Sequence, residues 1–232
     1  MLEHLSNIEL FYTSPNLISE KEILLSEDEF KHAVKVMRNA VGNDLFITNG
    51  KGDIFQTKIS VIKKNELIAE ITDQFKYKNQ SEKIIFCIPK LKNPDRLKYA
   101  IEKSVELGIT NFKIFESKYT ISKSSNIKRL QKIALAAMKQ SIRSFLPQIE
   151  FDTLEDILES ELEVIIFNQN AKNKFKVEDK YLKPAHFIFG PEGGFAKSEL
   201  KKFIDVQTFK LAHNRLRTET AIVKCASLLS IP

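Results

Sequence analysis

The sequence is poor in cysteine and contains no long apolar run. Its two cysteines, Cys87 and Cys225, each lie within an apolar pattern, which suits a reducing compartment better than a disulfide framework. No segment approaches the roughly 20 apolar residues of a membrane-spanning helix. The first residues lack a basic stretch followed by an apolar one, so no secretory signal is predicted. We therefore expect a cytoplasmic protein.

Motifs of several common catalytic and metal sites are also absent. The four histidines are scattered, and neither an HExxH nor a CxxC pattern occurs, so no metal site is predicted. Without a GxSxG pattern, a hydrolase has no support. A glycine-rich segment does occur at residues 190–194, but it lacks the Lys-Ser/Thr ending of a nucleotide P-loop. Glu192 within it would also repel a phosphate.

Positive charge is concentrated in the middle of the chain. The whole sequence has 36 basic and 30 acidic side chains, a net charge of +6. Residues 76–148 contain 16 basic and 5 acidic side chains, or +11, whereas residues 1–75 carry −4 and residues 149–232 carry −1. A polyanion such as a nucleic acid would be attracted to the middle stretch. A merely solvated basic surface is the alternative.

The pattern of apolar residues divides the chain into two domains. Residues 1–75 contain short strand patterns between tight turns, which predict a small β-barrel, with one helix opening at a capping box formed by Ser26–Glu29. The polar residues 76–82 are the expected linker. From residue 83 onward, strand patterns alternate with helical ones, which predicts an α/β domain with a parallel sheet covered by helices. The expected strands of that sheet are residues 84–88, 112–115, 164–167, 187–189 and 206–211.

Two loops near the carboxyl end follow strand patterns and precede helical ones. The first, Gly190–Gly194, holds three of only seven glycines, which permit positive φ and a close backbone approach. The second, from Leu211, contains Arg215, Arg217 and Glu219 before the closing helix. Because carboxyl ends of neighbouring parallel strands meet at one edge, both loops are expected to border one ligand site. The alternatives are a tight turn with a solvated Glu192 and a simple Arg217–Glu219 surface pair.

The two loops together resemble a known family. The segments GPEGGF at 190–195 and LRTETA at 216–221 are similar to those of the RsmE family of ribosomal RNA methyltransferases, within the SPOUT superfamily. Further similarity lies in KNPDR at 92–96, EKSVELG at 102–108 and the segment 32–38, so the resemblance covers nearly the whole chain. The family commonly has glycine at the position of Ala212.

The resemblance implies the fold and the reaction. It implies a SPOUT-type parallel sheet with a C-terminal trefoil knot, preceded by a PUA-like β-barrel that binds RNA. The implied reaction is methylation of N3 of a uridine in 16S rRNA of the small ribosomal subunit, with S-adenosyl-L-methionine as cofactor, by a homodimer. Another SPOUT activity, on a ribose 2′-O or on tRNA, is one alternative. A non-catalytic RNA-binding factor of ribosome assembly is the other.

The same resemblance suggests roles for individual residues. We expect Arg217 to orient the uracil or stabilise its anion, and Glu219 to position Arg217 or to take the proton. The expected cofactor pocket consists of Phe167, Phe189, Gly190, Glu192, Gly193, Gly194, Leu211, Ala212, Asn214, Leu216 and Thr220. Positive charge, and not the resemblance, suggests the contacts to RNA phosphates, which are Arg38, Lys90, Lys92, Arg96, Lys139 and Arg143.

Overall fold

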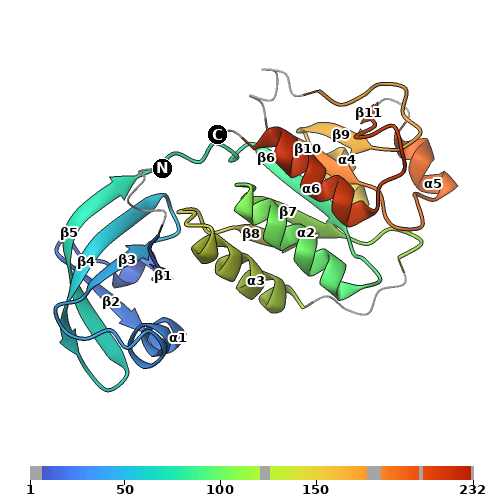
Figure 1. The fold of residues 1–232 in the computed structure, drawn as a ribbon. Coiled ribbons are helices and arrows are strands. Elements are labelled where there is room, and N and C mark those ends of the chain that lie inside the picture. The colour runs from blue at the N-terminus through green and yellow to red at the C-terminus, as the bar shows by residue number, and fades with distance from the viewer. Residues whose placement is uncertain (1–6, 121–125, 177–183, 204–205, 231–232) are drawn as a thin grey trace. The chain divides into compact units, whose positions relative to one another are not determined.

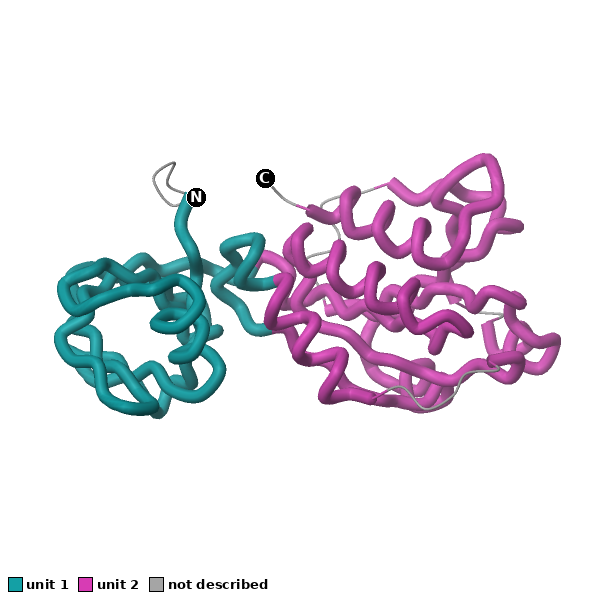
Figure 2. The backbone as a smooth tube through the Cα atoms, turned by 60° about the horizontal axis from the view of Figure 1, so that its bottom comes forward, with its two compact units in different colours: residues 1–79, 138–146 teal, residues 80–137, 147–232 magenta. Residues whose placement is uncertain are grey.

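The computed structural model describes residues 7–120, 126–176, 184–203 and 206–230. The chain divides into two compact units, residues 1–79 with 138–146 and residues 80–137 with 147–232 (Figure 2). The first boundary lies close to the expected linker. Residues 138–146 were expected in the second domain, and the structure places them in the first unit instead. Backbone hydrogen bonds explain this placement, because Leu146 N donates to Gly50 O and Gly52 N donates to Ser144 O, each over 2.9 Å.

The first unit, for which the short strand patterns predict a small β-barrel, is built on a five-stranded sheet. The strand order is β1-β3-β4-β5-β2, and only the β1–β3 pair is parallel. The inward side chains of alternating residues, such as Phe11, Ile23 and Ile47, form a core around Phe30 of the helix. The strands are β1 Leu10–Tyr12, β2 Glu22–Ser26, β3 Asp44–Thr48, β4 Asp53–Ile62 and β5 Glu66–Lys76.

The helix of the first unit starts where expected, but the expected capping box does not form. Helix α1, Glu27–Phe30, continues into a wider π-helical turn over Lys31–Val36. Ser26 makes no side-chain cap hydrogen bond. The Glu29 carboxylate instead accepts from Tyr12 N over 3.1 Å and pairs with Lys139 Nζ over 2.6 Å. The Lys139 ammonium and the backbone N–H of Tyr12 thus contact the Glu29 carboxylate that a capping box would have used.

The second unit is the predicted parallel α/β domain. Its six strands follow the order β11-β9-β10-β6-β7-β8, and every pair is parallel. They are β6 Ile84–Pro89, β7 Asn111–Phe115, β8 Gln148–Phe151, β9 Glu163–Phe167, β10 Ala185–Phe189 and β11 Gln207–Phe209. The trefoil knot implied by the resemblance stays a prediction.

Helices cover both faces of this sheet. Figure 1 shows α2 and α6 on one face and α4 on the other. The Asn93 side chain caps α2, accepting from Asp95 N over 2.8 Å, and the Thr153 hydroxyl caps α4 by accepting from Asp156 N. None of the helices in the part of the chain that the structure describes is long and apolar enough to cross a membrane. The helices are α2 Pro94–Glu106, α3 Ile127–Gln140, α4 Leu154–Glu159, α5 Lys197–Leu200 and α6 Thr218–Leu229.

Strand β10 lies in the middle of the sheet and is buried along its whole length. Its alternate residues Phe187 and Phe189 pack against Phe86 on the face that α2 and α6 cover. Ile188 points to the other face and packs in the cluster that includes Ile157 of α4. Because the strand is buried on both faces, its sequence is a nearly continuous apolar run, as in other parallel sheets.

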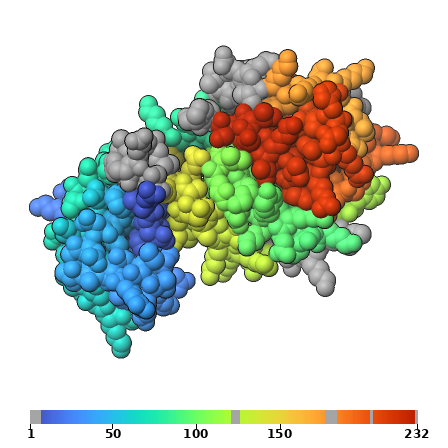
Figure 3. Space-filling model, in the orientation of Figure 1, coloured from blue at the N-terminus to red at the C-terminus, as the bar shows by residue number. Residues whose placement is uncertain are grey.

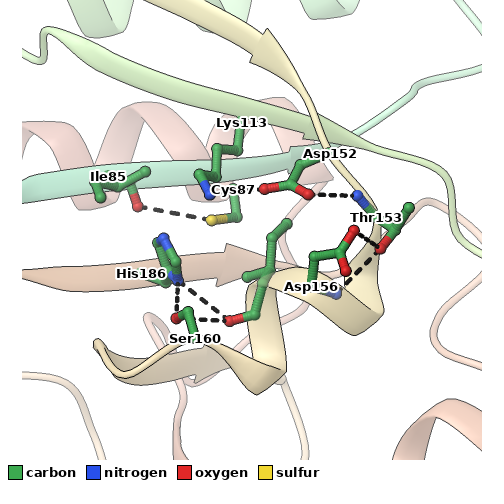
Figure 4. A network of polar contacts seen from close by, with 9 residues as sticks. Ile85, Cys87, Lys113, Asp152, Thr153, Asp156, Ser160 and His186 are labelled. Carbon is green, nitrogen blue, oxygen red and sulfur yellow. Dashed lines mark hydrogen bonds and ion pairs between the residues drawn. The ribbon is translucent and has the colours of Figure 1, made fainter.

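A polar network interrupts the apolar packing on the α4 face (Figure 4). Lys113 Nζ pairs with Asp152 Oδ2 over 2.6 Å. The His186 ring is buried, and its Nδ1 lies 3.1 Å from Ser160 Oγ and 3.3 Å from Ile157 O. Burial, together with the positive charge of Lys113, lowers the pKa of His186 below its ordinary value. The ring is therefore neutral in the folded protein around neutral pH.

Candidate active site

A cavity of about 630 Å³ lies at the carboxyl ends of β9 and β10. Three loops line it: residues 168–170 after β9, residues 190–195 after β10, and residues 211–217 before α6. Strand β9 pairs with both β10 and β11, so these loops emerge from adjacent positions at one edge of the sheet. This is the edge at which open α/β sheets bind ligands. The two C-terminal loops border one cavity as predicted, but their strands are not neighbours, because β9 lies between β10 and β11.

The glycines of the first loop have different structural roles. Gly194 has φ +74° with no atom within 4 Å of an added Cβ, so its constraint is conformational. Its N–H donates to Pro191 O over 2.9 Å and closes the turn. A Cβ on Gly190 would lie 3.4 Å from the Phe195 ring, so that position is confined by packing.

Glu192 is held in place by the loop that follows β6. Its Oε1 lies 2.6 Å from Arg96 Nη1, and its Oε2 accepts from the backbone N–H of Lys92 over 3.1 Å. Arg96 belongs to the first turn of α2 and also lines the cavity. The carboxylate in the glycine-rich loop is therefore an anchor between two loops and is not the solvated side chain of the alternative interpretation.

Glu219 also pairs with Arg96 and not with Arg217. Arg96 Nε lies 3.5 Å from Glu219 Oε1. Glu219 is buried, and its Oε2 has no hydrogen-bond partner among the residues that the structure describes. Arg217 is exposed at the N-cap of α6 and faces the cavity. The two expected catalytic side chains thus have different surroundings, one solvated and the other buried behind the cavity wall.

The start of α6 is tied to the end of β10. The Thr218 hydroxyl donates to Gly190 O over 2.9 Å. Arg217 occupies the N-cap position of α6, and no side chain caps the helix. Thr218 is used instead to join the helix to the first loop.

The cavity gathers most of the residues expected at the cofactor. Phe167, Phe189, Gly190, Glu192, Gly194, Leu211, Ala212, Asn214 and Leu216 line it, while Gly193 and Thr220 do not. Sequence reasoning did not assign Gln169, Asn170 or Phe195, which also line it, whereas Arg215 lies within the second of the expected loops. A signal for Gln169 and Asn170 was present in the sequence, because they follow the strand pattern at residues 164–167, and parallel strands all end at one edge of the sheet.

The residues expected at RNA phosphates fall in both units. Arg38, Lys139 and Arg143 belong to the first unit, and Lys90, Lys92 and Arg96 belong to the second. Several of their charges are already compensated, because Lys139 pairs with Glu29 and Lys90 pairs with Glu116 over 2.5 Å. Lys90 Nζ also lies 4.9 Å from the centre of the Phe151 ring. Lys92, by contrast, is exposed.

Comparison with known proteins identifies the family. Residues 78–230 match the model of an RNA methyltransferase domain, and residues 25–72 match that of an RNA methyltransferase PUA domain. The chain is 30% identical over 225 residues to the ribosomal RNA small subunit methyltransferase E of Rickettsia conorii, with 91% of each chain covered. It is 26% identical to the solved enzyme of that name from Neisseria gonorrhoeae, which was crystallised with S-adenosyl methionine, with a TM-score of 0.83 and 95% of each chain covered. A putative methyltransferase from Legionella pneumophila, 22% identical, shares the fold with a TM-score of 0.79 over 96% of each chain. The chain therefore belongs to the RNA methyltransferase family whose members combine this α/β domain with a PUA domain.

Proposed function

We propose that the protein transfers a methyl group from S-adenosyl-L-methionine to N3 of one uridine in the 16S rRNA of the small ribosomal subunit. The cavity at the carboxyl ends of β9 and β10 carries this proposal, since it is bordered by the two loops that resemble the family's motifs. The names of the relatives and the cofactor bound to the Neisseria enzyme support it. Because ribosomal RNA is the substrate, we infer that the protein acts in the cytoplasm.

The cavity fits the cofactor in size and in chemistry. Its volume of about 630 Å³ lies in the range of small-molecule sites, roughly 300–1,000 Å³. Apolar side chains of Phe189, Leu211 and Leu216 line it and suit an adenine ring, while the backbone around Gly190 and Gly194 supplies polar groups. When bound, the cofactor's sulfonium supplies an electrophilic methyl group.

We assign Arg217, which lies in the segment LRTETA, to act on the uracil. It lines the cavity and is exposed, and no carboxylate among the described residues pairs with it. A guanidinium presents several N–H donors in a fixed plane, which suits the carbonyl oxygens beside N3. As N3 gives its proton to solvent water, negative charge spreads onto those oxygens, so Arg217 stabilises the anion and favours deprotonation. Glu219 has its Oε2 buried, and we assign it to the structure of the cavity wall.

The target base must be accessible for this chemistry. N3 lies on the Watson–Crick edge, so the uridine has to be unpaired or turned out of its stack. We infer that the PUA domain and exposed basic side chains such as Lys92 hold the surrounding RNA through its phosphates.

We also infer that the protein forms a homodimer through α2 and α6. These helices contact each other and lie side by side at the surface (Figure 3). Ile222 and Cys225 of α6 are buried within the protomer, but Leu228 remains 40% exposed and Tyr99 of α2 remains 47% exposed. Light scattering of the wild type and of Leu228→Glu tests the inference. The wild type should have the mass of a dimer, and the substitution should shift it toward the monomer.

Methyl transfer to small-subunit RNA tests the proposed function. Purified protein is incubated with radiolabelled cofactor and with either naked 16S rRNA or assembled subunits that lack the modification. Label is expected in N3-methyluridine after digestion, and the modified site is expected to stop reverse transcription, because N3 methylation blocks pairing. Label in a 2′-O-methylated nucleoside, or in tRNA alone, would place the protein elsewhere in the superfamily. Failure to bind the cofactor would favour a non-catalytic assembly factor.

A further inference from the structure

Arg96 lies between two loops that are far apart in the sequence. Its guanidinium contacts Glu192 of the glycine-rich loop through Nη1 at 2.6 Å and Glu219 at the start of α6 through Nε at 3.5 Å. The three side chains are only partly exposed: 34% for Arg96, 29% for Glu192 and 11% for Glu219. One cation from α2 thus joins the two segments that bear the family's motifs.

We propose that Arg96 is a positioning residue that holds the glycine-rich loop and the start of α6 in the arrangement that binds the cofactor. It is then not a contact to RNA phosphates, the role that its position in the basic stretch suggested. The inference rests on the proposed function for the identity of the cofactor, but the loop contacts can be tested without it.

The charges around Arg96 favour an internal role. Two carboxylates share its guanidinium, so its positive charge is already compensated, and a phosphate would have to displace one of them. Arg215 and Arg217 differ, because both are exposed at the same cavity and neither pairs with a carboxylate among the residues that the structure describes. Arginines available to an incoming RNA are therefore present beside Arg96.

The contacts of the two carboxylates predict what loss of Arg96 does. Without Arg96, Glu192 keeps one hydrogen bond, because its Oε2 accepts from Lys92 N. Glu219 keeps none, since its Oε2 already lacks a partner among the described residues. A buried carboxylate without a counter-ion is unfavourable, so the start of α6 has to shift or admit water. The cavity then spends less time in its binding arrangement.

The size of the effect on cofactor affinity follows from the fraction of molecules whose cavity is in its binding arrangement. When only a fraction of the molecules is competent to bind, the apparent dissociation constant rises by the inverse of that fraction. If the Arg96 contacts keep the loops closed and their loss reduces the closed population to about a tenth, the affinity for the cofactor falls about tenfold.

The experiment compares Arg96→Met, which keeps an unbranched apolar stem, with Arg96→Lys, which keeps the charge but not the fork. Lys98→Met is the matched control, because Lys98 is exposed on the same helix. Three quantities are measured: cofactor affinity by calorimetry, amide hydrogen exchange of residues 190–196 in the free protein, and the salt dependence of RNA binding. Arg96→Met is expected to weaken cofactor binding about tenfold and to speed exchange, with an unchanged salt dependence. For Arg96→Lys, both the cofactor affinity and the exchange rate are expected to lie between those of Arg96→Met and the wild type.

Several outcomes overturn the inference. If cofactor affinity and exchange match the wild type while the salt slope falls by about 0.7–0.9, Arg96 is a phosphate contact. If Arg96→Met does not fold, Glu192→Gln breaks the shorter of the two contacts, and unchanged cofactor affinity in that variant rejects the proposal. A wild type that binds no cofactor refutes the proposed function, and the exchange measurement still decides the role of Arg96.

Discussion

The hydroxyl of Thr218 donates a hydrogen bond to the carbonyl oxygen of Gly190 over 2.9 Å, and this bond joins the first turn of α6 to the end of β10. Gly190 opens the glycine-rich loop, and Thr218 follows Arg217 directly. A side chain in one motif therefore fixes the backbone of the other, and the cavity wall between them depends on that contact.

Replacing Thr218 with valine tests this contact. The substitution keeps the shape and removes the donor, so the Gly190 carbonyl loses its partner at a cost of about 1 kcal/mol. We expect cofactor affinity to fall about fivefold, the factor that corresponds to that energy. The free energy of unfolding should fall by about the same 1 kcal/mol. Calorimetry and urea denaturation measure the two. Thr208→Val on β11 is the matched control. Equal cofactor affinities in the two variants would show that the Thr218 contact does not support the cofactor site.

Gly194 is expected to tolerate no β-branched residue. Its φ of +74° lies in the left-handed region, where a side chain costs about 1–2 kcal/mol. Gly194→Val should therefore distort the loop and abolish measurable cofactor binding. Gly193→Ala is the control, because its φ is not positive and its Cβ would make an ordinary contact at 3.7 Å from Tyr119. Cofactor affinity unchanged in Gly194→Val would exclude this loop from the site.

Arg217 is expected to act on the uracil more than on the cofactor. Arg217→Ala should lower kcat roughly 10²- to 10³-fold, as removal of one donor to a developing anion does. The affinity for the cofactor should change much less. Arg217→Lys keeps the charge without the planar fork and should recover only part of the rate. Single-turnover methyl transfer measures the effect, and a rate near wild type in Arg217→Ala would refute the assignment.

Lys92 is expected to contact an RNA phosphate. Its side chain is exposed, and the hydrogen bond to Glu192 uses its backbone N–H, so a side-chain change leaves that bond in place. Lys92→Gln should lower the slope of log K against log salt by about 0.7–0.9 and weaken binding to all RNA sequences alike. Lys64→Gln, exposed in the turn before β5, should leave the slope unchanged. An unaltered slope in Lys92→Gln would contradict the contact.

Stability is expected to fall on mild acidification because of His186. Burial lowers its pKa, so below its ordinary value of about 6.5 the unfolded state binds more protons than the folded state. The contribution of this histidine is complete above that pH, is lost as the pH falls, and cannot exceed about 1.4 kcal/mol per pH unit. A second ring N–H would also lack an acceptor, since Nε2 has no partner among the described residues.

Urea unfolding at pH 8, 6 and 5 measures this dependence. His186→Gln should be less stable at pH 8, because it loses the ring contacts, but its stability should change less between pH 8 and 5. His213→Gln, at an exposed position, should keep the wild-type dependence. Asp152 contributes separately. Burial acts to raise its pKa, but hydrogen bonds from Lys113 and Thr153 lower it overall, so its effect appears only as the pH falls below about 3.8.

Much of the fold was predictable because the relevant patterns are local. The run Ala185–Phe189 is apolar at every position except His186, as a strand buried on both faces requires. Asn93 before Pro94 marked the start of α2 by the chemistry of its side chain. The cavity followed from the same patterns, since the loops after all strands of a parallel sheet emerge at one edge, although the strand order itself was not predictable.

The partners of charged side chains were not predictable in this way. A capping box at Ser26–Glu29 and a pair between Arg217 and Glu219 both joined near neighbours in the sequence. In the structure Glu29 pairs with Lys139, and Glu219 pairs with Arg96. Partners so distant in sequence depend on where whole elements pack, which no local pattern encodes.

The sequence by itself determined the strand–helix alternation, the split into two domains and the two loops that border the cavity, because propensity, capping and apolar period act over a few residues. Only the tertiary structure decided that residues 138–146 pack with the first unit and that Arg96 joins Glu192 to Glu219. The physical reason is range: an ion pair forms between groups that the fold brings within about 4 Å, whatever number of residues separates them.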